Sequence, residues 1–102
     1  MIFKNIKTVD TYYKYPMSYR FGSIYNEDGI IRIYSNGKNN DYETKKFFYY
    51  KIKNQLIKSK FILTKNNNKK IRVFQKIEGG VLDKGEYKVK MVLNNYVRLE
   101  KI

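Results

Sequence analysis

The sequence predicts a mainly β protein of the α+β class: a small antiparallel β-barrel with one short helix near residues 53–58. Turn-forming residues divide the chain into short segments, as is typical of β-rich proteins. Apolar and cationic residues alternate with a period of two in several segments, which indicates strands with one face in water. The length of 102 residues allows one compact domain over 1–102, in which a closed barrel would remove exposed strand edges.

The first predicted hairpin joins residues 18–25 to residues 30–35. The connection ends in Asp28-Gly29, a pair that favours a tight hairpin turn. Asn36-Gly37 follows the second strand and would end it.

Two more hairpins are predicted in the second half of the chain. Residues 59–64 and 70–77 flank three asparagines at 66–68, and residues 86–93 and 96–101 flank Asn94-Asn95. The alternation within these strands assigns one set of residues to the core and another to water. The core set is Ile71, Val73, Gln75, Tyr87, Val89, Met91 and Leu93, and the outward set includes Arg72, Phe74, Lys76, Lys88 and Lys90.

The segment between residues 41 and 60 carries signals for both kinds of element. Phe48, Ile52 and Leu56 recur every four residues, and Asp41 could cap a helix. The aromatic run over 47–50 favours a strand instead. We therefore predict a strand over 46–51 followed by the short helix over 53–58.

The charge balance predicts a polyanionic partner. The chain has 22 Lys and Arg residues against 9 Asp and Glu residues, which gives a formal net charge of +13. Because Lys and Asn are both abundant, AT-biased coding is an alternative source of part of this excess. Cys and His are absent, which excludes disulfides, Cys/His zinc sites, thiol nucleophiles and imidazole bases.

The basic residues are interleaved with tyrosines, a combination that suits nucleic-acid binding. Cations contact phosphates, and bases stack on aromatic rings. The candidate binding residues are Tyr12, Tyr13, Tyr15, Arg20, Arg32, Tyr42, Lys45, Lys46, Lys58, Lys69, Lys70 and Arg72. The alternative is that the lysines only solvate the surface and that about half of the tyrosines belong to the core of a small barrel.

Catalysis and cofactors receive little support from the sequence. The nine carboxylates are scattered, and none of their spacings predicts a metal site. A small basic ribonuclease that uses Tyr, Lys and Arg, and a protein-interaction or inhibitor module, are the alternative functions. No cofactor, membrane span or targeting segment is predicted, so the expected location is the cytoplasm.

One part of the chain resembles a known family. The pattern KNQLIKS, then IRVF at 71–74, then GEYKV at 85–89 is similar to the second half of SRA domains and related PUA-like modules. The segment NNDYETKKFFYYK at 39–51 is similar to the aromatic strand that lines the base pocket of that family. The chain departs from the family in lacking its glycine-rich loop after Tyr50 and its histidine-containing start, which puts the pocket in doubt more than the fold.

The resemblance implies a PUA/SRA-like fold and a reader of modified (methylated) cytosine. Such a module binds double-stranded DNA, flips the base out and holds it in a pocket. Asp41 would correspond to the base-reading aspartate, and Tyr50 or Tyr49 to a stacking aromatic. The resemblance also implies a role as the specificity domain of a bacterial restriction system. Independently of the resemblance, the basic and aromatic residues leave RNA open as an alternative partner.

Overall fold

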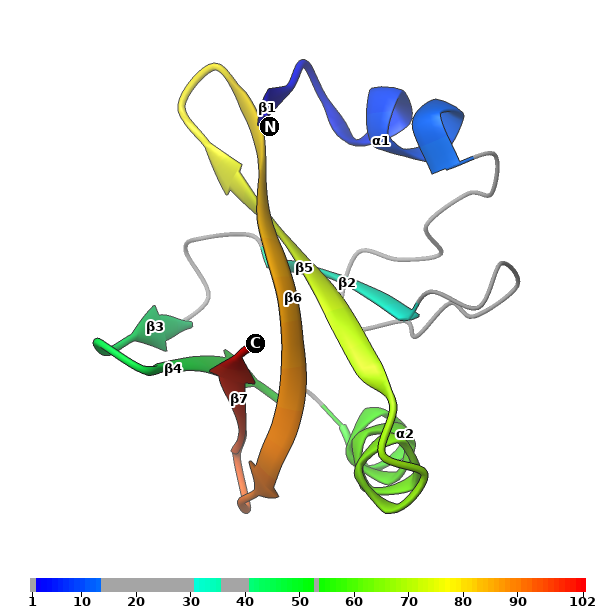
Figure 1. Cartoon of the computed structure of the whole chain (residues 1–102), viewed down its shortest axis with the longest axis vertical. Coiled ribbons are helices and arrows are strands. Elements are labelled where there is room, and N and C mark those ends of the chain that lie inside the picture. The colour runs from blue at the N-terminus through cyan, green and yellow to red at the C-terminus, as the bar shows by residue number, and fades with distance from the viewer. Residues whose placement is uncertain (1, 14–30, 36–40, 53) are drawn as a thin grey trace.

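The computed structural model describes residues 2–13, 31–35, 41–52 and 54–102, and its elements are arranged around one long central strand (Figure 1). The predicted strand over 18–25, with Tyr15 and Arg20, lies outside the described residues. In chain order the elements are β1 (Ile2–Phe3), α1 (Ile6–Tyr13), β2 (Ile31–Ser35), β3 (Tyr42–Glu43), β4 (Phe47–Lys51), α2 (Gln55–Asn66), β5 (Lys70–Ile77), β6 (Gly80–Val92) and β7 (Tyr96–Lys101).

The strands form a mixed sheet in the order β2-β5-β6-β7-β4-β3, and β1 pairs with the start of β6. The pairs along this path are antiparallel except β2–β5, which is parallel. Within the described residues β2 and β3 are the two edges of the sheet. The predicted closed antiparallel barrel is therefore wrong. The edge strand β3 is only two residues long, and the parallel β2–β5 pair requires a long crossover that a series of hairpins would not contain.

The strands in the second half are close to the prediction. The hairpin of β6 and β7 is confirmed, and β7 has the predicted bounds. The strand predicted over 86–93 begins earlier, at Gly80, because a tight turn joins β5 directly to β6. Gly79 in this turn has a φ of 84°, a left-handed conformation that glycine adopts without steric cost.

The predicted strand over 59–64 is wrong, since these residues belong to α2, and the predicted short helix over 53–58 is only the beginning of a longer one. Asn54 caps α2, because its side chain accepts a hydrogen bond from the Ile57 backbone N–H at 2.9 Å. Ile57, Phe61 and Thr64 recur at helical spacing and are buried. The burial of this face outweighs the strand propensity of the segment.

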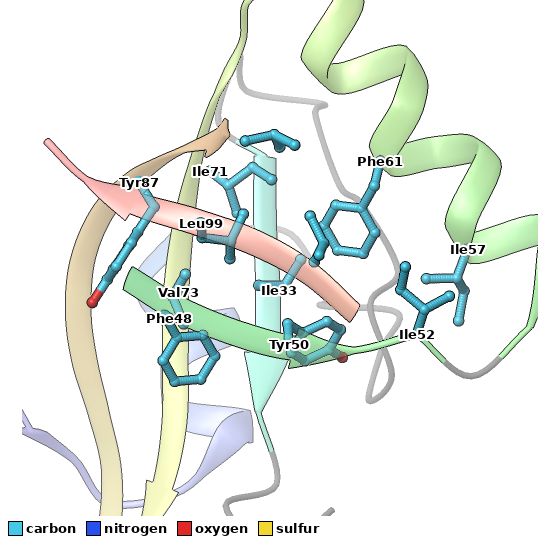
Figure 2. Close-up of a cluster of buried hydrophobic side chains, with 12 residues drawn as sticks. Ile33, Phe48, Tyr50, Ile52, Ile57, Phe61, Ile71, Val73, Tyr87 and Leu99 are labelled. Carbon is cyan, nitrogen blue, oxygen red and sulfur yellow. The ribbon is translucent and has the colours of Figure 1, made fainter. Parts of the chain in front are cut away.

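The main core lies between α2 and one face of the sheet. Figure 2 shows Phe61 and Ile57 of α2 pointing toward Ile33 and Ile52. Its other members come from β4 to β7, namely Phe48, Tyr50, Ile71, Val73, Tyr87, Val89, Val97 and Leu99. This core holds one face of β4 and β7 against the helix, and their alternate residues lie on the opposite face.

A second, smaller core packs the N-terminal segment onto the other end of the sheet. It consists of Phe3, Val9, Phe74 and Val81. The prediction that Phe74 faces water is therefore wrong: β1 and α1 cover it. Met91, predicted to face the core, is 44% exposed, because the register between β6 and β7 shifts between Val89 and Met91.

Candidate nucleic-acid interface

Strand β4 separates two sets of aromatic residues. Phe48 and Tyr50 are 1% and 4% exposed and belong to the core. Phe47 and Tyr49 are half-buried and lie on the opposite side of the strand, because successive side chains in a strand point to opposite faces. The adjacent tyrosines 49 and 50 therefore have different surroundings, and they do not line one pocket together.

The side of the sheet opposite the core carries a cluster of aromatic rings. We call Tyr42, Phe47, Tyr49 and Tyr96 the outer aromatic face. Tyr42 stacks on Tyr49 with ring centroids 4.6 Å apart and planes inclined by 10°. Tyr96 contacts Tyr42 edge-on at 5.5 Å, and Phe47 contacts Tyr49 edge-on at 6.3 Å. These rings come from three neighbouring strands, β3, β4 and β7, so the sheet holds them in fixed positions.

Two cations belong to the outer aromatic face. The Arg98 guanidinium lies 5.3 Å from the Phe47 ring centroid and 5.6 Å from that of Tyr49. The Lys51 ammonium lies 5.7 Å from the Tyr96 ring centroid. All three distances are within the range of cation–π attraction. The surface therefore combines planar apolar rings with positive charge.

The strand register extends this surface toward lysines on the neighbouring strands. Lys70 of β5 pairs with Lys88 of β6, Lys88 pairs with Glu100 of β7, and Glu100 pairs with Phe47 of β4. The Glu100 carboxylate lies 3.5 Å from the Lys88 ammonium and 4.0 Å from that of Lys90. One carboxylate is thus shared by two exposed lysines, which leaves an excess of positive charge beside the rings.

Asp41 lies at the start of β3, where the ends of β2 and β4 meet. Its Oδ2 accepts a hydrogen bond from the Ser35 hydroxyl and its Oδ1 accepts one from the Lys51 backbone N–H, both at 2.6 Å. Ser35 is fully buried. Two donors from different strands therefore orient this carboxylate, and such bonds to a charged acceptor are stronger than those between neutral groups.

Tyr50 lies in the core beside this carboxylate. Its hydroxyl donates to the Tyr34 carbonyl at 3.2 Å, and its ring contacts Phe61 edge-on at 5.8 Å. Burial raises the pKa of Tyr50, and the negative charge of Asp41 raises it further. Burial also raises the pKa of Tyr34. The position of Tyr50 does not suit the predicted role of an exposed stacking ring.

The predicted phosphate-binding lysines lie on different elements of the structure. Lys45 and Lys46 are exposed between β3 and β4, and Lys69 and Lys70 are exposed where α2 gives way to β5. Lys58, on α2, is half-buried, and its ammonium lies 3.4 Å from the Asn94 side-chain oxygen.

The structure also shows the surroundings of four other predicted residues. Arg32 is fully buried, which contradicts its prediction as a surface cation. The Arg72 guanidinium donates to both carboxylate oxygens of Asp83 at 3.0 Å, so its charge is balanced within the protein. Tyr12 is 58% exposed but contacts Phe3 edge-on at the end of α1, and Tyr13 follows it in that helix rather than in an extended segment.

Residues that the sequence reasoning missed complete the outer aromatic face. Phe47, Tyr96 and Arg98 were not among the predicted binding residues. Alternation does indicate them: Val97 and Leu99 are the core residues of β7, and Tyr96 and Arg98 are their neighbours. The pairing of β7 with β4, which brings Arg98 opposite Tyr49, is a long-range contact that local sequence does not indicate.

Two further observations concern metal binding and membrane spans. In the part of the chain that the structure describes, no three His, Cys, Asp or Glu side chains gather as a metal site would require. Neither described helix is long and apolar enough to cross a membrane.

Comparison with known proteins identifies the fold. No protein-family model and no curated protein matches the sequence. Among solved structures, the chain is similar to the SRA domain of SUVH5 in complex with methylated CHH DNA and in complex with fully methylated CG DNA. Each match has a TM-score of 0.78 and 17% sequence identity, and covers 98% of this chain and 85% of the other. The chain therefore has an SRA-like fold, as the resemblance of its second half predicted.

Proposed function

We propose that this protein is a DNA-binding domain that reads a modified cytosine after flipping it out of the duplex. The observation that carries the proposal is the likeness of nearly the whole chain to a domain whose solved complexes contain methylated DNA. The net charge of +13 supports a DNA partner, because each cation that reaches a phosphate releases counterions.

Asp41 is the residue we propose to read the flipped base. Carboxylates accept hydrogen bonds from the N4 amino group of cytosine, and flipped bases are read at their Watson–Crick edge. The Ser35 hydroxyl and the Lys51 N–H hold the Asp41 carboxylate in one orientation. A carboxylate that is fixed before the base arrives has less conformational entropy to lose when it binds.

Binding to matched duplexes tests the proposal. The affinity for a short duplex with one 5-methylcytosine is compared, by fluorescence anisotropy, with that for the unmodified duplex at 50 and 200 mM salt. We expect tighter binding to the methylated duplex and a loss of affinity for both at the higher salt. A 2-aminopurine beside the modified cytosine reports extrusion by a rise in fluorescence. Equal affinity for the two duplexes would contradict the proposal.

Two variants distinguish base reading from general DNA binding. Asp41→Asn places a donor opposite the N4 amino group of the flipped base and so weakens the flipped state. Because the 5-methyl group is held in the pocket only in that state, we expect a roughly tenfold preference for the methylated duplex to disappear while phosphate-driven binding to the unmodified duplex persists. Glu43→Gln is the matched control, because Glu43 is a nearby exposed acidic residue whose partner is Lys84. It should retain the preference.

The proposal includes a role as the specificity domain of a bacterial restriction system. In the source organism, plasmids that carry the modified cytosine should then transform less efficiently than unmodified plasmids. Deletion of the coding sequence should abolish the difference. Equal transformation by both plasmids in the intact strain would contradict this role and leave the DNA-reading proposal standing.

A further inference from the structure

We infer that the outer aromatic face is a second binding surface, on which unpaired bases of single-stranded nucleic acid stack. This surface is distinct from Asp41, and the inference does not depend on the reading of modified cytosine. Three properties of the face point to a ligand. Its rings lie outside both hydrophobic cores, the Tyr42 ring is 49% exposed, and the ion pairs among the described residues include neither Lys51 nor Arg98.

The rings of this face lie outside both hydrophobic cores. Phe47, Tyr49 and Tyr96 are half-buried, and Tyr42 is 49% exposed. Tyr49 covers one side of the Tyr42 ring, and the exposed remainder is open to a ligand. Exposed aromatic rings held on a sheet are the kind of surface on which bases of single strands stack.

Arg98 gives the outer aromatic face a positive charge that favours an anionic ligand. Its guanidinium is held against Phe47 and Tyr49, and its Nε atom is buried without a hydrogen-bond partner. The ion pairs among the described residues do not include Arg98. A partly buried cation without a carboxylate is costly, and a phosphate beside the rings would lower this cost by balancing the charge.

The charge around the rings selects among partners that use aromatic surfaces. A neutral sugar or an apolar peptide would stack on the tyrosines but would gain little from Lys51, Arg98, Lys88 and Lys90. A polyanion gains from all of them. A duplex keeps its bases stacked on one another, so its base faces are not available to the tyrosines. A single strand offers both free base faces and phosphates.

Oligonucleotides with and without bases test the inference. The affinity of the full chain is measured by fluorescence anisotropy for the eight-residue strands dT8 and rU8, and for an abasic strand with the same number of phosphates. Because stacking uses the faces of the bases, we expect dT8 and rU8 to bind about fivefold or more tightly than the abasic strand. Equal affinity for all three would overturn the inference, since only phosphates would then be recognised.

Variants locate the binding on this face. Tyr49→Ala should reduce the affinity for dT8 and rU8 to about that of the abasic strand, and Tyr49→Phe should retain most of it because the ring remains. Leu63→Ala is the matched control, since Leu63 is a large apolar residue of α2 that is 63% exposed. Unchanged dT8 binding by Tyr49→Ala, with its fold verified by circular dichroism, would overturn the inference.

A third variant separates this surface from the proposed DNA-reading site. Asp41→Asn should bind dT8 as tightly as the unmodified protein, because Asp41 is not part of the outer aromatic face. If Asp41→Asn and Tyr49→Ala lose dT8 binding equally, the two surfaces are one site and the inference is wrong. Failure to distinguish methylated from unmodified duplex would overturn the proposed function but would not affect these results.

Discussion

Adjacent tyrosines on β4 show how differently the two faces of the same sheet are used. Tyr50 is 4% exposed, lies against Phe61 of α2 and donates its hydroxyl to a backbone carbonyl. Tyr49, one residue earlier, lies on the outer aromatic face and stacks on Tyr42. A tyrosine therefore stabilises the fold at position 50, whereas a tyrosine at position 49 is available to a ligand.

Aromatic content alone therefore does not indicate function in this chain. The face toward α2 uses aromatic and aliphatic residues to exclude water. The outer face instead holds half-buried and exposed rings with Lys51 and Arg98 beside them. Variants of the core face should therefore change stability, and variants of the outer face should change binding.

Phe61→Ala is expected to have the largest effect on the fold. Phe61 is fully buried between α2 and the sheet, and removal of a buried Phe ring typically costs about 3–5 kcal/mol of unfolding free energy. Urea denaturation followed by circular dichroism measures the change. Leu63→Ala, on the exposed side of the same helix, should cost far less. Similar losses for both variants would contradict the assignment of the core face.

Alkaline pH is expected to weaken the folded state through the buried tyrosines. The pKa of Tyr50 is raised in the folded state, so the protonated form stabilises the fold fully below the unfolded value of 10.0, and this contribution is lost as pH rises above it. The unfolding free energy should fall above pH 10 by up to about 1.4 kcal/mol per pH unit for such a group. Urea denaturation between pH 9 and 11.5 measures it.

Tyr50→Phe sharpens this test, because the variant has no hydroxyl to ionise. Its stability should fall less steeply with pH than that of the unmodified protein. Leu63→Ala, on the exposed side of α2, is the control and should leave the slope unchanged because it removes no titratable group. An identical slope in all three proteins would show that Tyr50 does not carry this dependence.

Asn54→Ala should have an intermediate effect. The side chain of Asn54 caps α2 by accepting from the Ile57 N–H, and loss of such a cap typically costs about 1 kcal/mol. The measurement is the midpoint of urea denaturation. A cost near zero would indicate that packing alone positions the start of α2.

The smallest effect is expected for Glu43→Gln. Glu43 is exposed and its carboxylate lies 2.8 Å from the Lys84 ammonium. The Lys84 side chain is only 10% exposed, but the Gln side chain keeps an oxygen that can accept from its ammonium, and water screens the open carboxylate end of the pair. We therefore expect thermal unfolding to change by about 1 kcal/mol or less. A large loss of stability would contradict the view that this pair contributes only weakly.

The sequence was most informative where local signals agreed. Alternation and the Asn94-Asn95 turn predicted the β6–β7 hairpin, and the pattern around IRVF indicated the SRA-like fold. These features depend on contacts between neighbouring residues, which a short segment of sequence records.

The remaining features depend on contacts between distant residues. The segment over 59–64 has strand propensity, yet it is helical because Phe61 packs on a sheet assembled from the rest of the chain. The sequence predicts Arg32 as a cation that binds nucleic acid, yet its side chain is fully buried. The outer aromatic face could not be predicted as a unit, because the pairing of β4 with β3 and β7 brings Tyr42, Tyr49 and Tyr96 together.

The central claim is that the modified base is read at Asp41 and not on the outer aromatic face. The most direct test is the ratio of the affinity for the methylated duplex to the affinity for the unmodified duplex. It is measured for three proteins: the original chain, Asp41→Asn and Tyr49→Ala. We predict a ratio well above one for the original chain and for Tyr49→Ala, and a ratio near one for Asp41→Asn. A ratio of one in the unmodified protein, or its loss in Tyr49→Ala alone, would contradict the claim.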